Sequence, residues 1–90
     1  MAVTALKIKI LPESPDTNLE ELGKQVEESL KKSGAVRIDK IEEEEIAFGL
    51  KALIVTLAWP ESLETEKAEQ ACQISGVSSC EIIDYRRAFG

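Results

Sequence analysis

The chain has 90 residues, of which 43% are hydrophobic and 31% are charged, with a net charge of −6 and no histidine. These values are typical of one small soluble domain, and they argue against binding to nucleic-acid phosphates because no cluster of lysine and arginine stands out. Without histidine the chain lacks the commonest general base and the usual transition-metal ligand. We therefore expect no conventional enzyme, no cofactor and no metal site.

The sequence carries no signal for a membrane or for secretion. No apolar run approaches the roughly 18 residues that span a bilayer, and the N-terminus lacks the features of a signal peptide. Cys72 and Cys80 are interpreted as small, half-buried apolar residues, because disulfides are rare in reducing compartments and a zinc site needs more ligands. We therefore predict a cytoplasmic protein with a single domain over residues 1–90.

The chain begins with a predicted strand and a predicted helix. Apolar residues and lysines alternate over residues 3–11, which is typical of a half-buried strand. Apolar residues then recur at helical spacing over residues 17–32, where Thr17 and Glu20 fit an N-terminal capping box. Gly34 is the expected end of this helix.

The middle of the chain predicts a hairpin. Residues 36–46 are a predicted strand whose second half contains the glutamate block, residues 42–45. Such charge is typical of an exposed sheet edge. Residues 47–49 are the expected connection, and residues 50–59 the second strand, with alternate apolar residues on one face. Trp59 ends this strand as a residue of the core or of its rim.

The last third of the chain predicts a second helix over residues 63–74 and a strand over residues 77–85. The helical pattern over residues 63–74 is weaker than the pattern over residues 17–32. We expect the strand to divide its side chains between two faces, Cys80 and Ile82 on one and Ile83 and Tyr85 on the other. Residues 86–90 form a tail of uncertain order.

The order of these elements, βαββαβ with short connections, predicts an α+β ferredoxin-like sandwich. In this fold a four-stranded antiparallel sheet carries both helices on one face. The other sheet face is then open or covered by a partner. Two alternatives remain, namely another small α+β arrangement and a sheet that pairs across a dimer.

Three features have both a structural and a functional interpretation. The glutamate block is a solvated edge or part of a binding surface, and it cannot converge on one metal ion because consecutive strand residues point to opposite faces. Phe48 is a core residue or an exposed interface anchor, and Gly49 supplies backbone freedom beside it. Arg86 and Arg87 belong to a solubilising tail, or they form a cationic probe for a phosphate or carboxylate.

Three segments resemble the archaeal elongation factor 1-beta family. The first is the opening strand with its proline-containing turn and Asp16–Leu22. The second and most specific is Ile46–Leu53, which is similar to the family's aromatic-Gly-aliphatic-Lys-x-Leu signature. The third is the Gly76-Val77 turn with the strand that reaches Asp84. Together they cover residues 3–85, nearly the whole chain.

The resemblance implies a ferredoxin-like fold and a guanine nucleotide exchange factor, which promotes GDP release and GTP rebinding on the GTPase elongation factor 1-alpha. It places Phe48, Gly49 and Lys51 at the interface with that GTPase. Exchange of this kind is non-covalent, so it requires no catalytic residue. The expected partner is the GTPase, without direct contact to nucleic acid or membrane, and the free protein is expected to be a monomer.

The C-terminus departs from the eukaryotic members of this family. Those members end near a lysine that reaches the partner's magnesium site, whereas this chain has Gly90 near that position and no lysine after Lys67. Arg86 and Arg87 are the cations that this chain offers instead. The competing interpretation is a small-molecule-binding regulatory module of the same fold, although no ligand loop is recognisable. A small enzyme is a third interpretation, weakened by the absence of histidine.

Overall fold

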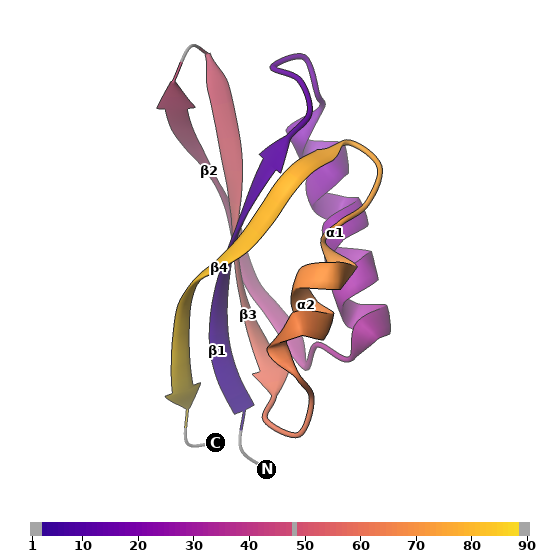
Figure 1. Ribbon diagram of the computed structural model, residues 1–90, viewed down its shortest axis with the longest axis vertical. Coiled ribbons are helices and arrows are strands. Elements are labelled where there is room, and N and C mark those ends of the chain that lie inside the picture. The colour runs from indigo at the N-terminus through magenta and orange to yellow at the C-terminus, as the bar shows by residue number, and fades with distance from the viewer. Residues whose placement is uncertain (1–2, 48, 89–90) are drawn as a thin grey trace.

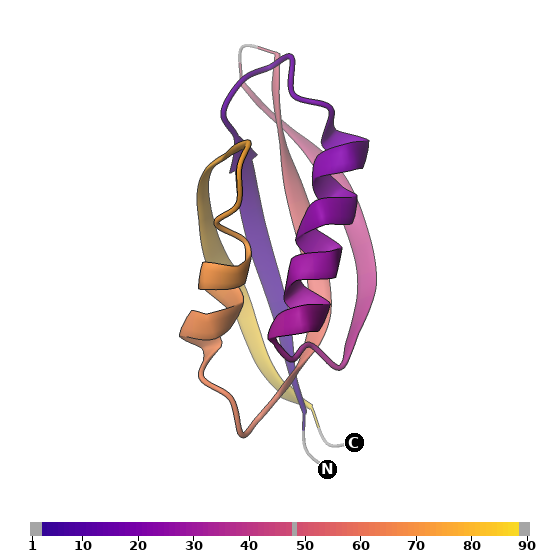
Figure 2. The ribbon, with the colours of Figure 1, turned by 90° about the vertical axis from the view of Figure 1, so that its right-hand side faces the viewer.

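The computed structural model describes residues 3–47 and 49–88, which form the predicted α+β sandwich (Figure 1). In chain order the elements are β1 Val3–Pro12, α1 Leu19–Ser33, β2 Arg37–Ala47, β3 Leu50–Pro60, α2 Thr65–Ala71 and β4 Val77–Ala88. The strands form one sheet in the order β2-β3-β1-β4, and each neighbouring pair is antiparallel. Both helices cover the same face of this sheet (Figure 2). The predicted ferredoxin-like architecture is therefore confirmed.

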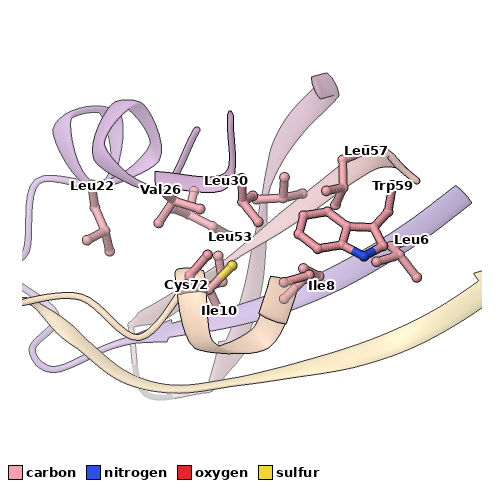
Figure 3. Close-up of a cluster of buried hydrophobic side chains, with 13 residues drawn as sticks. Leu6, Ile8, Ile10, Leu22, Val26, Leu30, Leu53, Leu57, Trp59 and Cys72 are labelled. Atoms are coloured by element: carbon pink, nitrogen blue, oxygen red, sulfur yellow. The ribbon is translucent and has the colours of Figure 1, made fainter. Parts of the chain in front are cut away.

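The hydrophobic core lies between this sheet and its helices. Figure 3 shows side chains from both helices and both central strands meeting there. The labelled residues are Leu6, Ile8 and Ile10 of β1, Leu22, Val26 and Leu30 of α1, Leu53, Leu57 and Trp59 of β3, and Cys72 after α2. Trp59 is fully buried, and its indole N–H donates to the Leu63 carbonyl at 3.3 Å. Trp59 is therefore a core residue whose polar group is satisfied.

The N-cap of helix α1 lies one residue after the predicted N-cap, Thr17. Asn18 is the N-cap, and its side-chain oxygen accepts a hydrogen bond from the Glu21 backbone N–H at 3.1 Å. Thr17 therefore does not cap the helix. At the other end Gly34 closes the helix as predicted, and its N–H points to the carbonyls of Leu30 and Lys31. The capping-box spacing favoured Thr17, whereas asparagine is the more strongly preferred N-cap residue of the two, in agreement with the observed cap.

Helix α2 is shorter than its predicted span, residues 63–74. The Leu63 N–H closes a turn onto the Pro60 carbonyl at 3.1 Å, so the helix begins only after its N-cap, Glu64. The helix ends at Cys72, which is its C-cap. Neither helix within residues 3–47 and 49–88 is long and apolar enough to cross a membrane.

Strand β4 is longer than predicted, because residues 86–88 continue it. Arg86 pairs with Ala5, and the backbone of Arg87 pairs with Thr4. The expectation of a tail of uncertain order is therefore wrong for residues 86–88. Their order comes from backbone pairing with the first residues of β1, which lie near the opposite end of the sequence.

The pairing of β4 with β1 is irregular at Ile83. Its neighbours pair with two consecutive residues of β1, Ile82 with Ile8 and Asp84 with Lys7. Ile83 is thus the extra residue of a bulge, which shifts the alternation beyond it. Tyr85 consequently pairs with the core residue Leu6, and it shares the helix-covered face, where it remains 52% exposed. The expectation that Tyr85 shares the face of Ile83 is wrong for this reason.

Both cysteines lie where the end of α2 meets β4. Cys72 is fully buried and Cys80 partly buried, and both are free thiols. The Cys80 thiol donates to the Glu69 carbonyl at 3.1 Å. Burial raises the pKa of Cys72 from 9.0 to about 12, with further contributions from Cys80 and Glu69. The predicted apolar role of the cysteines is confirmed, with Cys72 more deeply buried than expected.

The raised pKa of Cys72 predicts a loss of stability at alkaline pH. The unfolded chain releases this proton near pH 9 and the folded chain near pH 12, so the free energy of unfolding falls as the pH rises between these values. Between pH ~9 and pH ~10 we expect the loss to be about 1 kcal/mol larger in the parent than in Cys72→Ala. Urea unfolding of both proteins measures this difference, and equal pH dependences would contradict the assignment.

The glycine that closes α1 predicts a second stability difference. Gly34 has a φ of +124°, and a Cβ there would lie 2.5 Å from Leu63 Cδ1. Gly34→Ala should therefore lower the free energy of unfolding by about 2–4 kcal/mol, through backbone strain and overpacking together. Gly49 is the matched control, because its φ is +77° and nothing lies within 4 Å of its Cβ position. Gly49→Ala should cost only about 1–2 kcal/mol. Similar losses in denaturant unfolding would show that the Leu63 contact is unimportant.

Candidate partner-binding site

The hairpin of β2 and β3 carries the most specific sequence signature to one end of the molecule (Figure 1). Gly49 adopts a positive φ in the connection and leaves open space around it. Lys51 is half-exposed, and its Nζ lies 3.7 Å from Glu43 Oε1. Phe48 lies outside the described residues, so its contact with a partner stays a prediction. Within the signature, Gly49 and Lys51 are thus at the surface and available to a partner, whereas Ala52 and Leu53 are buried.

The glutamate block divides between the two faces of the sheet. Glu42 and Glu44 pair with Ile54 and Ala52, whereas Glu43 pairs with the core residue Leu53 and Glu45 with Lys51. Consecutive glutamates therefore lie on opposite faces, as the strand periodicity predicts. All four are exposed on β2, which is an edge strand. Within residues 3–47 and 49–88, no group of three or more His, Cys, Asp or Glu side chains could hold a metal ion.

A cavity of about 380 Å³ lies beside the hairpin. It is lined by residues of the β1–α1 connection, the start of α1 and the hairpin, among them Thr17, Asn18, Glu20, Glu43 and Lys51. The sequence alone did not predict this cavity, because its two sides are separated along the chain by most of α1 and β2. The predicted topology was the signal that could have indicated it. Because β1 and β3 are antiparallel neighbours, the connection after β1 and the hairpin before β3 lie at the same end of the sheet.

The second predicted cluster lies on the last strand. Arg86 is 80% exposed at its side chain, and its Nε lies 3.3 Å from Asp84 Oδ2. Its pairing with Ala5, which alternates with the core residue Leu6, places it on the sheet face without helices. The Arg87 backbone is part of β4, whereas its side chain lies outside the described part of the chain. An ion pair as exposed as Arg86–Asp84 is weak, so Arg86 can exchange Asp84 for an anion on a partner.

The predicted site residues do not form one site. The hairpin connection lies at one end of the molecule, and the end of β4 lies at the other, beside the N-terminal end of β1 (Figures 1 and 2). The molecule measures 41 × 21 × 18 Å along its principal axes. Gly49 and Lys51 are therefore separated from Arg86 by most of the long axis. A partner that contacts both clusters must extend along the whole domain.

Comparison with known proteins identifies the family. Residues 5–88 match the family described as EF-1 guanine nucleotide exchange domain. Three relatives named elongation factor 1-beta are similar over nearly their whole length. The relative from Methanosarcina barkeri is 47% identical over 97% of this chain and 99% of its own length. Those from Methanothermobacter thermautotrophicus and Sulfolobus acidocaldarius are 43% and 39% identical, each over 89% of this chain and 90% of their own length.

These matches bear directly on the competing interpretations. They agree with the resemblance carried by the signature at residues 46–53 and with the order of elements. They do not favour a small-molecule-binding regulatory module. The chain belongs to the EF-1 guanine nucleotide exchange domain family, and its function is guanine nucleotide exchange in translation elongation.

Proposed function

We propose that this chain binds the GTPase elongation factor 1-alpha in the cytoplasm and promotes GDP release and GTP rebinding without covalent chemistry. The match of residues 5–88 to an exchange-domain family is the observation that carries this proposal. The proposal assigns the activity to this single domain, acting as a monomer and without direct contact to nucleic acid.

The proposed mechanism is thermodynamic coupling. A protein that binds the nucleotide-free GTPase more tightly than the GDP-bound GTPase must weaken GDP binding by the same free energy. Such coupling is typically worth about 1–3 kcal/mol, which corresponds to roughly 5–150-fold in affinity. It requires an extended contact surface and no general base or nucleophile, in agreement with a sequence that has no histidine.

The two predicted clusters then have different roles. The hairpin end, with Phe48, Gly49 and Lys51, anchors the GTPase. The other end presents Arg86 and Arg87, whose guanidinium groups suit phosphate and carboxylate oxygens. A cation there competes with magnesium for those oxygens, and loss of magnesium loosens GDP. The separation of the clusters along a 41 Å axis supports a binding mode in which the GTPase lies along the domain.

The exchange activity is tested by release of a fluorescent GDP analogue from purified elongation factor 1-alpha. In the presence of excess unlabelled GDP, sub-stoichiometric amounts of the chain should accelerate release by at least about tenfold. Sub-stoichiometric amounts suffice because each molecule serves many GTPases in turn. The acceleration should saturate once all of the GTPase is bound. The chain with a disrupted core, for example Leu57→Asp, is the control. An unchanged release rate with the parent chain would reject the proposed function.

The roles of the two ends predict different kinetic defects. Phe48→Ala and Lys51→Ala should raise the chain concentration that gives half-maximal release by about 3–10-fold, because they weaken the anchor. Arg86→Ala with Arg87→Ala should instead lower the maximal release rate, because the competing cations are lost. Lys32→Ala, on the exposed end of α1, is the matched control for removal of a positive charge. If the arginine double variant keeps the parental maximal rate, the cation role is wrong, whatever the hairpin variants show.

A further inference from the structure

A groove of about 300 Å³ runs between α1 and β2 on the helix-covered side of the sheet. Its apolar residues are Leu19 and Gly23 of α1, Ile41 of β2 and Leu53 of β3. Its charged residues are Glu20, Lys24, Glu27 and Glu43. Figure 2 shows β2 running beside α1 and extending past it at the edge of the sheet. The groove is therefore accessible from the free edge of the sheet.

A glycine, Gly23, lies in the wall of this groove and is itself buried. Gly23 lies in the second turn of α1, where glycine weakens a helix relative to alanine. A Cβ at this position would lie 3.7 Å from Ile41 Cγ2 and 3.9 Å from Leu53 Cδ1. These are ordinary van der Waals distances, so neither close packing nor a positive φ requires glycine here. Without a side chain at Gly23, α1 and β2 leave room for a methyl group at this point of the groove.

The charges around the groove indicate the chemistry of what fills that space. Three carboxylates, Glu20, Glu27 and Glu43, line it together with one cation, Lys24. Glu27 pairs with Lys31 at 3.6 Å and Glu43 with Lys51 at 3.7 Å, but all four side chains are at least 37% exposed. Such exposed pairs contribute little, so their carboxylates remain available to cations of a partner. An apolar side chain flanked by lysine or arginine is therefore complementary to this groove.

The groove continues into the cavity beside the hairpin. Both are lined by Leu19, Glu20 and Glu43. The hairpin cavity also contains Gly49 and Lys51, which are proposed to contact the GTPase. The groove is thus an extension of that surface along α1, and its occupant is most simply the same partner.

We propose that this groove binds a basic segment of the GTPase, which inserts one apolar side chain between α1 and β2 beside Gly23. This inference rests on the proposed function. The carboxylates of Glu20, Glu27 and Glu43 hold the flanking cations, and Ile41 and Leu53 contact the inserted side chain. The groove contributes affinity and orientation, while the arginines at the other end of the domain act on the nucleotide site.

The decisive variant is Gly23→Ala, because the proposal predicts opposite changes in stability and binding. The methyl group fits against Ile41 and Leu53 and strengthens α1, so Tm should rise on the order of 5 °C. The same methyl group occupies the groove, so affinity for nucleotide-free elongation factor 1-alpha should fall by at least about tenfold. Calorimetric titration and thermal unfolding measure the two effects on one protein preparation.

Adjacent glutamates of α1 give a matched pair for the charge argument. Glu27 lines the groove, whereas Glu28 is exposed and does not. Glu27→Gln should weaken binding about 2–5-fold and reduce its salt dependence, because one ion pair with the partner is lost. Glu28→Gln carries the same change of charge and should bind like the parent. Equal effects of the two substitutions would overturn the assignment of the basic segment to the groove.

The outcomes separate this inference from the proposed function. If the parent chain accelerates GDP release and Gly23→Ala binds the GTPase as tightly as the parent, the groove proposal is wrong and the exchange function stands. If Gly23→Ala lowers Tm, the glycine is required by packing and the groove proposal is also wrong. If the parent chain neither binds the GTPase nor accelerates release, the proposed function fails and the groove inference falls with it.

Discussion

Burial of a single face of the sheet is the constraint on which the rest of this structure depends. Alternate residues of β1 and β3 supply most of the core from the sheet side, and both helices must cover them. A chain of this length has only enough apolar residues for one such layer. The opposite sheet face, the hairpin and the strand ends are consequently left for other purposes. Gly49, Lys51 and Arg86 lie in those regions.

Local periodicity predicted those elements whose order is set by their own residues. β1, α1 and β3 each carry a clear alternation or helical spacing, and their predicted and observed bounds agree closely. The errors arose where distant residues decide the outcome. The backbone of residues 86–88 is ordered by pairing with β1. The sheet face on which Tyr85 lies depends on a bulge at Ile83, and no residue type in the sequence indicates that bulge. Sequence patterns describe one element at a time, so pairing between the two ends of the chain escapes them.

The residues of the candidate site are predictions from the sequence, whereas their arrangement in space required the fold. The signature at residues 46–53 identified the hairpin as the specific part of the chain, and the paired arginines identified the other cluster. Nothing in the sequence showed that the long axis separates them. The groove between α1 and β2 also requires the fold, because its walls come from three elements. The one residue in the sequence that could have indicated the groove is Gly23, because glycine weakens the interior of a helix.

The shape of the domain suits exchange by binding better than exchange by local chemistry. Strand β3 runs from the hairpin to the opposite end of the sheet, and its 11 residues extend about 34 Å at the usual rise of an antiparallel strand. It is hydrogen-bonded on both sides, by β2 and β1, so it cannot shorten or bend without breaking the sheet. In the proposed binding mode, this stiffness holds the anchor at one end and the cations at the other at a fixed separation. In this proposed mode the GTPase adapts to the domain, and the conformation that fits both ends is proposed to hold GDP weakly.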